Sequence, residues 1–253
     1  MMNNVVKAGS LLLGDGIPKI CVPIIESNHE DILKMAKIIY KSDADMVEWR
    51  VDFYKDFHNI DIVNKTLMCI KEILKEKPLL FTFRTAHEGG QEDISYEEYS
   101  VLLKEAAVNA DIADIEVYRS KNTSKLISYV KKSAVVIGSY HDFNQTPGTD
   151  EIIDRLKYMV SAGADIPKIA VMPGCRMDVI RLMEASLKAR QILGKPVITM
   201  SMADTGLISR AAAEFTCSAV TFGCIGRPSA PGQIEAGTLR KIMNILHSNQ
   251  ERK

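Results

Sequence analysis

A lysine lies in the middle of an apolar stretch of the chain. Residues 165–173 read DIPKIAVMP, a pattern typical of a buried β-strand. Because side chains alternate along a strand, Lys168 shares a face with Ile166 and Ala170. If the sheet is covered on both faces, the ammonium lacks water and readily gives up its proton, and a neutral amine attacks carbonyl groups to form a Schiff base. Alternatively, the lysine reaches solvent along its own stem or pairs with Asp165.

Ionisable side chains recur near the ends of the neighbouring predicted strands. In one of these strands Glu48, Arg50 and Asp52 alternate with apolar residues and therefore share a face. The others are Arg84, Glu88, Asp114, Glu116, His141 and Arg210. Each has a structural explanation by itself, such as an ion pair between Glu48 and Arg50. Their convergence on one end of a sheet predicts an active site.

The residue types limit the chemistry of that site. A lysine amine suits a ketone or an aldehyde, whereas Arg50, Arg84 and Arg210 suit a carboxylate or a phosphate. His141 is the natural proton carrier near neutral pH, and Asp114, one strand away, is expected to fix its tautomer. No group of residues has metal-ligand spacing. We therefore predict an enzyme without metal or cofactor that forms an imine with an anionic substrate.

Eight predicted strands alternate with eight predicted helices, and this order positions the polar residues. The strands are expected at 19–23, 46–53, 79–84, 112–118, 134–140, 165–173, 197–202 and 219–225. The helices are expected at 29–41, 61–76, from 95 onward, 122–132, 149–162, 177–193, 208–215 and 233–248. Asn28 or Ser27 is expected to cap the first helix, and Ser95 with Glu98 forms a capping box.

The number of strand–helix units predicts an α/β fold, a (β/α)₈ TIM barrel formed by residues 1–253 as one domain. Residues 5–17 are expected to form a β-hairpin that closes the bottom of the barrel, with Gly14-Asp15-Gly16 as a turn before Pro18. An open, doubly wound sheet is the alternative, although the glycine-rich dinucleotide motif is absent after the first strand.

The composition predicts a cytoplasmic protein. The 253 residues are 46% hydrophobic and 25% charged, and 32 basic residues balance 32 acidic ones, so no overall field favours nucleic acid or an anionic membrane. The five cysteines are odd in number and lack CxxC spacing, which indicates free thiols in a reducing compartment. The N-terminal apolar run is too short for a signal peptide, and no segment reaches transmembrane length.

Six segments carry a family resemblance. They are 48–52 (EWRVD), 81–84 (FTFR) with 88–90 (EGG), 139–143 (SYHDF), 163–173 (GADIPKIAVMP), 199–202 (TMSM) and 229–233 (SAPGQ). Together they resemble the type I 3-dehydroquinate dehydratases, in order, from about residue 18 to the C-terminus. The lysine segment is the most specific part. The resemblance implies a (β/α)₈ barrel, usually a homodimer, that catalyses the third step of the shikimate pathway toward the aromatic amino acids.

The resemblance also implies residue roles in a syn elimination from 3-dehydroquinate to 3-dehydroshikimate. Lys168 matches the Schiff-base lysine, His141 the general acid and base, and Glu88 a carboxylate near that histidine. The positions that match substrate contacts are Glu48, Arg50, Arg84, Met200, Met202, Arg210, Phe222, Ser229 and Gln233. Asp114, which matches a carboxylate behind the histidine, and Glu116 are expected to have supporting roles. One departure is Pro23, where some members carry a serine that contacts the substrate.

Two other functions stay open at this point. A class I aldolase would also form an imine, but it needs a phosphate site after the last strands, for which residues 223–226 (GCIG) are a weak candidate. A catalytically silent barrel that binds carboxylate metabolites would form no covalent adduct. The segment from Gly226 to Gln233, rich in Gly and Pro, is expected to act as a lid over the site.

Overall fold

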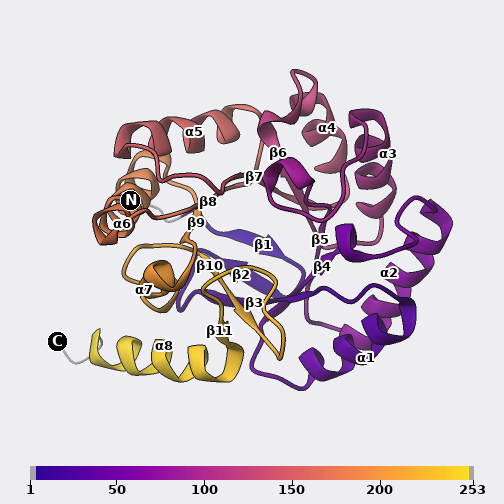
Figure 1. Ribbon diagram of the computed structural model, residues 1–253, viewed down its shortest axis with the longest axis horizontal. Helices are drawn as coiled ribbons and strands as arrows, with labels where there is room; N and C mark the ends of the chain where they lie inside the picture. Colours follow the sequence, from indigo (N-terminus) through magenta and orange to yellow (C-terminus); the bar gives the residue numbers. More distant parts are fainter. Residues whose placement is uncertain (1–3, 251–253) are drawn as a thin grey trace.

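A curled sheet of parallel strands surrounded by helices forms the centre of the protein (Figure 1). The computed structural model describes residues 4–250, so Met1–Asn3 of the segment considered for a signal peptide lie outside it. In sheet order the strands are β11 (Ile234–Glu235), β10 (Val220–Cys224), β3 (Lys19–Ile24), β4 (Met46–Arg50), β5 (Leu79–Thr82), β6 (Ile112–Glu116), β7 (Val135–Asp142), β8 (Ile166–Val171) and β9 (Ile198–Ser201).

The sheet closes on itself between β9 and β10. A parallel bridge joins Val197 to Ser218, and the backbone N–H of Ala219 donates to the carbonyl of Val197 at 2.8 Å. Because β10 also pairs with β3, the eight strands from β3 to β10 form a closed ring. The predicted (β/α)₈ barrel is therefore confirmed, and the open doubly wound sheet is wrong.

Helices follow the barrel strands and cover their outer face. They are α1 (His29–Tyr40), α2 (Ile60–Leu74), α3 (Tyr96–Ala106), α4 (Thr123–Val130), α5 (Thr149–Ser161), α6 (Arg176–Leu193), α7 (Leu207–Ala211) and α8 (Ala236–Gln250). Asn28 caps α1 through the backbone N–H of Asp31, and the predicted capping box of Ser95 and Glu98 begins α3. Within residues 4–250, no helix combines the length and the apolar character that a membrane crossing requires.

Two apolar layers result from the alternation of side chains along the strands. Ile169 and Val171 of β8 belong to the layer between the sheet and the helices. Ile166 and Ala170 belong to a smaller cluster inside the barrel, and Lys168 shares their face, as predicted. The lysine is therefore inside the barrel and not among the helices.

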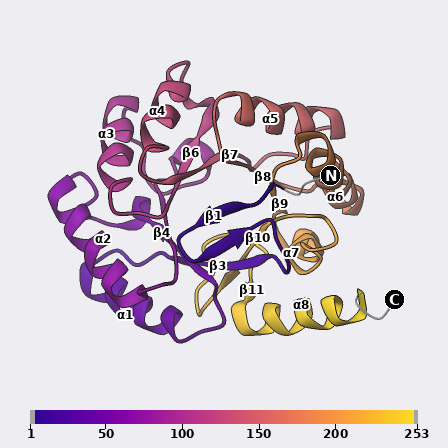
Figure 2. The same cartoon turned by 180° about the vertical axis from the view of Figure 1, so that it is seen from behind.

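A hairpin closes the amino-terminal end of the barrel, as expected (Figure 2). Its strands are β1 (Val6–Ala8) and β2 (Leu11–Leu13). Ala8 and Leu13 point into the inner apolar cluster, where they join Met46 and Ile198 from the barrel strands. The chain reverses between β1 and β2 at Gly9 and Ser10, and residues 14–16 form the later turn that leads into β3.

Several predicted boundaries are wrong. In two cases the strand is shorter than predicted, because the residues directly after it form a short 3₁₀ helix. The strand predicted at 46–53 ends at Arg50, and Val51–Phe53 forms such a helix. The strand predicted at 112–118 ends at Glu116, followed by Val117–Arg119. The predicted last helix (233–248) begins only at Ala236, because Ile234 and Glu235 pair with β10 instead.

Three other element ends also differ from the predicted ones. The predicted strand 79–84 ends at Thr82, whereas the strand predicted at 134–140 continues through His141 to Asp142. The helix predicted at 208–215 is only the short α7, and irregular turns follow it.

The hairpin offers a matched pair of substitutions that tests its role as a closing element. Leu13 is fully buried, whereas Leu12 beside it is 47% exposed. We expect Leu13→Ala to lower the free energy of unfolding by about 2–5 kcal/mol, because it leaves a cavity in the inner cluster. Leu12→Ala is expected to change it by less than about 0.5 kcal/mol. Urea unfolding of both variants measures the difference, and equal effects would show that the hairpin is a loose appendage.

Candidate active site

A cavity of about 160 Å³ opens at the carboxyl ends of the barrel strands. Twelve of the residues predicted to serve the reaction line it: Glu48, Arg50, Arg84, Glu88, His141, Lys168, Met200, Met202, Arg210, Phe222, Ser229 and Gln233. Asp114 and Glu116 are bonded behind these residues, whereas Pro23 is not part of the cavity wall. The carboxyl end is where (β/α)₈ barrels place their active sites.

Lys168 meets a carboxylate inside the barrel. Its side chain is 4% exposed, and its Nζ donates to Oδ2 of Asp114 at 2.9 Å. The ammonium also lies 4.8 Å from the ring centre of Phe222. The alternative pairing with Asp165 is wrong, because that carboxylate faces outward and binds Lys131 at 2.8 Å. The lysine is thus held in the cavity by an internal partner.

Asp114 is the most enclosed carboxylate of the site. Besides Lys168, it accepts hydrogen bonds from Nη2 of Arg84 at 2.7 Å and from the hydroxyl of Ser139. Burial alone would raise the pKa of this carboxyl, but the cations of Arg84 and Lys168 hold the pKa well below its usual range. Asp114 therefore stays ionised at neutral pH and cannot serve as a proton donor.

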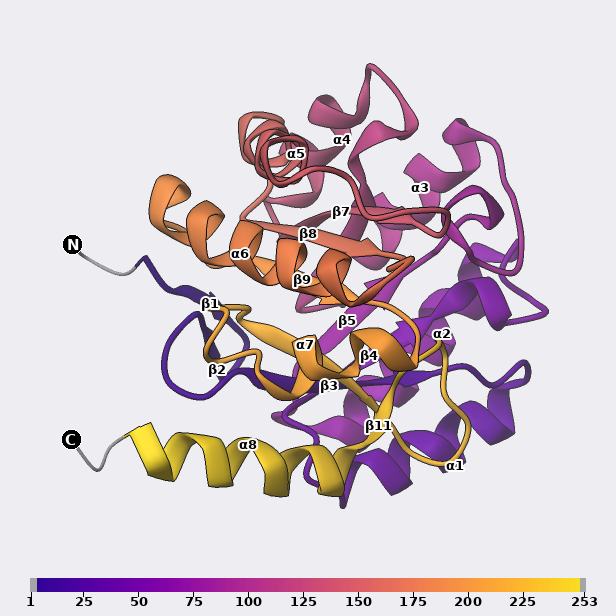
Figure 3. The ribbon, with the colours of Figure 1, turned by 60° about the vertical axis from the view of Figure 1, so that its left-hand side comes forward.

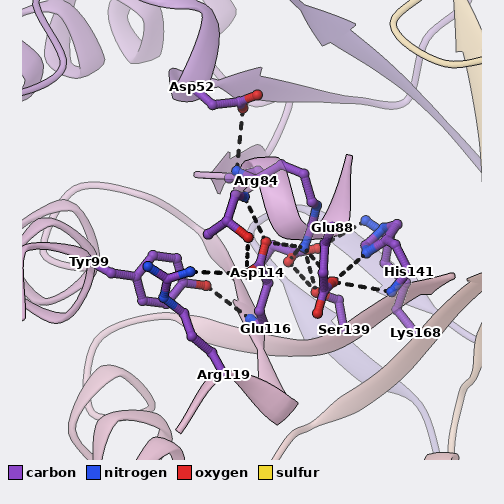
Figure 4. Close-up of polar contacts among 12 residues, drawn as sticks. Asp52, Arg84, Glu88, Tyr99, Asp114, Glu116, Arg119, Ser139, His141 and Lys168 are labelled. Carbon is purple, nitrogen blue, oxygen red and sulfur yellow. Dashed lines mark hydrogen bonds and ion pairs between the residues drawn. The ribbon is translucent and has the colours of Figure 1, made fainter. Parts of the chain in front are cut away.

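The guanidinium of Arg84 joins three carboxylates (Figure 4). In addition to its bond with Asp114, its Nη1 lies 3.1 Å from Glu116 and 3.4 Å from Glu88. Glu116 also accepts from the backbone N–H and hydroxyl of Thr85, at 2.8 and 2.9 Å. Burial alone would lower the pKa of Arg84, but these three carboxylates raise it well above its ordinary value. The donors of Arg84 are thus largely occupied within the protein.

His141 is oriented by Glu88 and not by Asp114, which corrects the tautomer assignment expected from the sequence. Its Nδ1 lies 2.9 Å from Oε2 of Glu88, and its backbone N–H donates to the same oxygen at 3.1 Å. The physical reason is local. The 3₁₀ helix that contains Glu88 follows β5 and lies beside the end of β7, which contains His141. Asp114 lies deeper in the barrel, and its carboxylate is already bonded to Arg84 and Lys168.

The electrostatics of this pair favour neutral partners. Burial, followed by the positive charges of Arg84 and Lys168, lowers the pKa of His141 well below its ordinary value. Burial and the charge of Glu116 raise the pKa of Glu88 well above its ordinary value. Since Oε2 of Glu88 already accepts from a backbone N–H, Nδ1 is the natural donor to it, and the lone pair is then on Nε2. His141 is therefore suited to accept a proton from a ligand.

Glu48 and Arg50 form no ion pair with one another in the described part of the chain. Arg50 instead binds Asp52 through two parallel hydrogen bonds, of 2.8 and 2.7 Å. Asp52 leaves the strand face because it also accepts from the backbone N–H groups of Arg84 and Gln91. The structural ion pair considered from the sequence is therefore wrong.

Glu48 has a neutral partner instead. The hydroxyl of Thr82 donates to Oε1 of Glu48 at 2.9 Å and holds this carboxyl group at the cavity wall. A carboxylate in this position accepts hydrogen bonds from the hydroxyl groups of a ligand.

Arg210 differs from the other arginines of the cavity in having no carboxylate partner. It is 2% exposed, and within residues 4–250 its guanidinium bonds only the thioether of Met200, at 3.6 Å, and the carbonyl of Pro231, at 3.3 Å. Its Nε is buried without any hydrogen-bond partner. Burial lowers the pKa of Arg210 to about 10. A buried cation without a counter-ion points to an anionic ligand.

The loop between β10 and β11 covers one side of the cavity. Within the loop, the backbone N–H of Ser229 donates to Oε1 of Gln233 at 2.8 Å, and Nε2 of Gln233 donates to the hydroxyl of Ser229 at 3.0 Å. Gly232 has φ +76°, and a Cβ there would lie 2.1 Å from the carbonyl oxygen of Ala203. The loop thus packs closely on the segment after β9. Its closure as a lid stays a prediction.

Two further residues, Phe143 and Ser139, complete the site, and neither is among the residues predicted from the sequence. Phe143 lines the cavity and packs against Gly89, where a Cβ would lie 2.2 Å from the ring. Ser139 bonds both Asp114 and Arg84. Both belong to the SYHDF segment, so alternation along β7 could have identified Ser139 as inward. Among the described residues, no group of three or more His, Cys, Asp or Glu side chains could hold a metal ion.

Comparisons with known proteins agree on one family. The model of the type I 3-dehydroquinase family matches residues 20–250. A 3-dehydroquinate dehydratase from Bacillus licheniformis is 44% identical, with 98% of this chain and all of that protein aligned. One from Clostridioides difficile is 42% identical over 98% of this chain and 99% of that protein.

Solved structures extend the comparison. A type I 3-dehydroquinate dehydratase from Clostridium difficile, covalently modified with comenic acid, has a TM-score of 0.94 at 42% identity and covers 98% of this chain and 100% of its own. One from Geobacillus kaustophilus has a TM-score of 0.94 at 31% identity, with 97% of both chains covered. A phospho-2-dehydro-3-deoxyheptonate aldolase from Thermotoga maritima, 13% identical with a TM-score of 0.64 over 98% of this chain and 73% of that one, shares only the fold.

Glu88 predicts an unusual dependence of stability on pH. A carboxyl whose pKa is higher in the folded than in the unfolded state stabilises the fold while protonated, and this contribution is lost as the pH rises through the raised pKa. In the Glu88→Gln variant the side chain stays neutral. We therefore expect its free energy of unfolding to fall less than that of the parent above about pH 4.3, the ordinary pKa of glutamate. Urea unfolding at a series of pH values measures this.

The exposed carboxylate Glu97 provides the control for this prediction. Glu97→Gln is expected to leave the parent's pH profile in place. Parallel profiles for parent and Glu88→Gln would contradict the assignment of a raised pKa.

Proposed function

This chain belongs to the type I 3-dehydroquinase family, and on that premise we propose that it dehydrates 3-dehydroquinate to 3-dehydroshikimate through an imine on Lys168. The observation that carries the proposal is a single cavity lined by a buried lysine amine, a histidine whose Nδ1 is held by Glu88, and an arginine that has no carboxylate partner among the described residues. The amine can react with a ketone, the imidazole can transfer a proton, and the guanidinium can bind a carboxylate. The substrate has the ketone and the carboxylate, and the elimination moves the proton.

Imine formation is the first part of the proposed reaction. The amine of Lys168, having given up a proton, attacks the C3 carbonyl carbon, and the resulting carbinolamine loses water to become an iminium ion. Asp114 lies 2.9 Å from the lysine nitrogen and stays ionised, so it stabilises the positive charge of both the ammonium and the iminium. His141 carries protons between the amine and the departing oxygen.

Elimination is the second part. The iminium withdraws electrons, so Nε2 of His141 removes a C2 proton and the C–H electrons form an enamine. The enamine expels the C1 hydroxyl, which takes the proton back from His141 and leaves as water. One imidazole serving both events suits a syn elimination. Glu88, bonded to Nδ1, holds the imidazole ring so that Nε2 faces the ligand in both events. Hydrolysis of the imine consumes one water and releases the product and Lys168.

The remaining residues of the cavity have positioning roles in this proposal. Arg210 binds the substrate carboxylate, because its charge has no partner in the described protein. Glu48 and Arg50 orient ring hydroxyl groups from the opposite wall of the cavity. Ser229 and Gln233 contact the substrate from the loop, as the family resemblance implies. Arg84 acts by fixing the carboxylates around Lys168 and His141.

Two variants separate the proposed roles of the central residues. Lys168→Ala removes the amine, so borohydride should trap no adduct with 3-dehydroquinate and turnover should nearly vanish. His141→Ala keeps the amine but lacks the base and acid, which lowers turnover by roughly 10²–10⁴-fold for each step that it serves. Imine should therefore accumulate, and mass spectrometry should detect the protein with an added substrate or product mass.

The outcomes of this experiment distinguish the alternatives. If the parent forms the product, detected by its conjugated enone absorbance, but is never trapped by borohydride, the imine route is wrong. Near-native turnover of His141→Ala would make the histidine structural and Glu88 the favoured base. A parent that binds substrate but neither forms an adduct nor turns over would be a silent carboxylate-binding barrel.

We also propose that the chain forms a homodimer through α6 and α7, which lie side by side at the surface (Figure 3). Exposed apolar side chains gather on these helices and on the turns that follow α7. They are Met177, Ile180, Leu207, Ile208 and Phe215. Apolar surface of this kind is commonly covered by a second subunit. The resemblance to a usually dimeric family supports the same conclusion.

Sedimentation velocity tests the dimer. Ile180→Glu and Ile208→Glu each place a charge in the apolar surface, and we expect both to shift the protein from dimer to monomer. Val108→Glu is the control, because Val108 is also an exposed apolar residue but follows α3, away from α6 and α7. A parent that sediments as a monomer would refute the proposal.

Two further proposals concern the chain as a whole. All five cysteines are free, and we propose on this ground that the protein functions in a reducing cytoplasm. The hairpin packs on the apolar cluster inside the barrel, and the helices pack on the apolar layer around the sheet. Because the same strands contribute to both layers, we propose that the chain acts as a single domain.

A further inference from the structure

Arg210 has two neutral acceptors, one for each terminal nitrogen of its guanidinium. Nη1 points at the sulfur of Met200, on β9, and Nη2 at the carbonyl of Pro231, in the loop between β10 and β11. Both Arg210 and Met200 are buried, at 2% and 7% exposure. Their contact is therefore shielded from water, where even a weak acceptor gains strength.

Neutral acceptors have a property that a carboxylate lacks. A carboxylate next to Arg210 would neutralise its charge and occupy two donors of its planar fork, as the carboxylates around Arg84 do. A thioether fixes the direction of one N–H without removing the charge. The buried Nε of Arg210 has no hydrogen-bond partner among the described residues, so the positive charge of the guanidinium is not compensated there.

We propose that Met200 is a positioning residue, whose thioether orients the Arg210 guanidinium toward the substrate carboxylate while leaving its charge uncompensated. The inference deepens the proposed function and rests on it, because it takes the carboxylate of 3-dehydroquinate as the ligand of Arg210. Met200 thus acts through a hydrogen bond to another side chain, in addition to any apolar contact with the ring. The sulfur is the atom that matters, since a hydrocarbon of similar size accepts no hydrogen bond.

A double-mutant cycle tests the inference. Met200→Leu keeps an apolar side chain of similar volume but removes the acceptor, and we expect KM for 3-dehydroquinate to rise about twofold to tenfold with a smaller change in kcat. Arg210→Ala should raise KM about tenfold to a hundredfold. Because Met200 acts through Arg210, the double variant should have the KM of Arg210→Ala alone. Multiplied effects would show that the two residues act independently and would overturn the proposal.

A ligand without a carboxylate provides a second readout. Trapping of cyclohexanone on Lys168 by borohydride requires the amine but not Arg210. We expect parent and Met200→Leu to be trapped at equal rates. A slower reaction of the variant would mean that the substitution disturbs the cavity itself, and the positioning role would be refuted.

The control variant is Met159→Leu, the same substitution at a buried methionine of α5 in the outer layer. It is expected to keep the kinetic constants of the parent, which separates the effect of the lost sulfur contact from a general effect of replacing a core methionine. Absence of dehydration by the parent would refute the proposed function, whereas an active parent with a multiplicative cycle refutes only the role of Met200.

Discussion

The site depends on one buried guanidinium. Arg84 bonds Asp114 at 2.7 Å and approaches Glu116 and Glu88 at 3.1 and 3.4 Å. Three carboxylates this close would repel one another in a buried cavity, and removing one partner from such a network leaves an uncompensated buried charge. The arrangement of Lys168 and His141 follows from this network, because Asp114 holds the first and Glu88 the second. Arg84 therefore determines the positions of the Lys168 amine and the His141 imidazole relative to the ligand.

Arg84 and Arg210, both buried in the cavity wall, show how environment assigns different tasks to the same residue type. Arg84 is surrounded by carboxylates that raise its pKa, whereas burial without an anion lowers the pKa of Arg210 to about 10. The first is a structural cation, already neutralised in the free protein. The positive charge of Arg210 is not compensated by an anion among the described residues. A ligand carboxylate can therefore pair with Arg210 without displacing a carboxylate of the protein.

Much of the fold and of the site was predictable, because both depend on regular periodicities. Alternation along β8 placed Lys168 inside the barrel, and the rule that barrels act at their carboxyl ends brought together residues as far apart in sequence as Glu48 and Gln233. The predictions that proved wrong concern the hydrogen-bond partners of individual side chains. Asp52 left its strand because two backbone N–H groups from another segment, those of Arg84 and Gln91, donate to its carboxylate in addition to Arg50. The partner of His141 depends on which of two nearby carboxylates is already occupied, and such competition is invisible in the sequence.

The position of the hairpin has a consequence for how the protein can be handled. β1 lies at the closed end of the barrel, and α8 runs outside the barrel and ends on the same side of the molecule (Figure 3), so both ends of the described chain lie away from the carboxyl ends of the strands, where the cavity opens. An attachment at either terminus, whether an immobilising surface, a fluorescent label or a neighbouring enzyme, is therefore directed away from the opening. Tethering at the termini leaves diffusion to and from the mouth unobstructed.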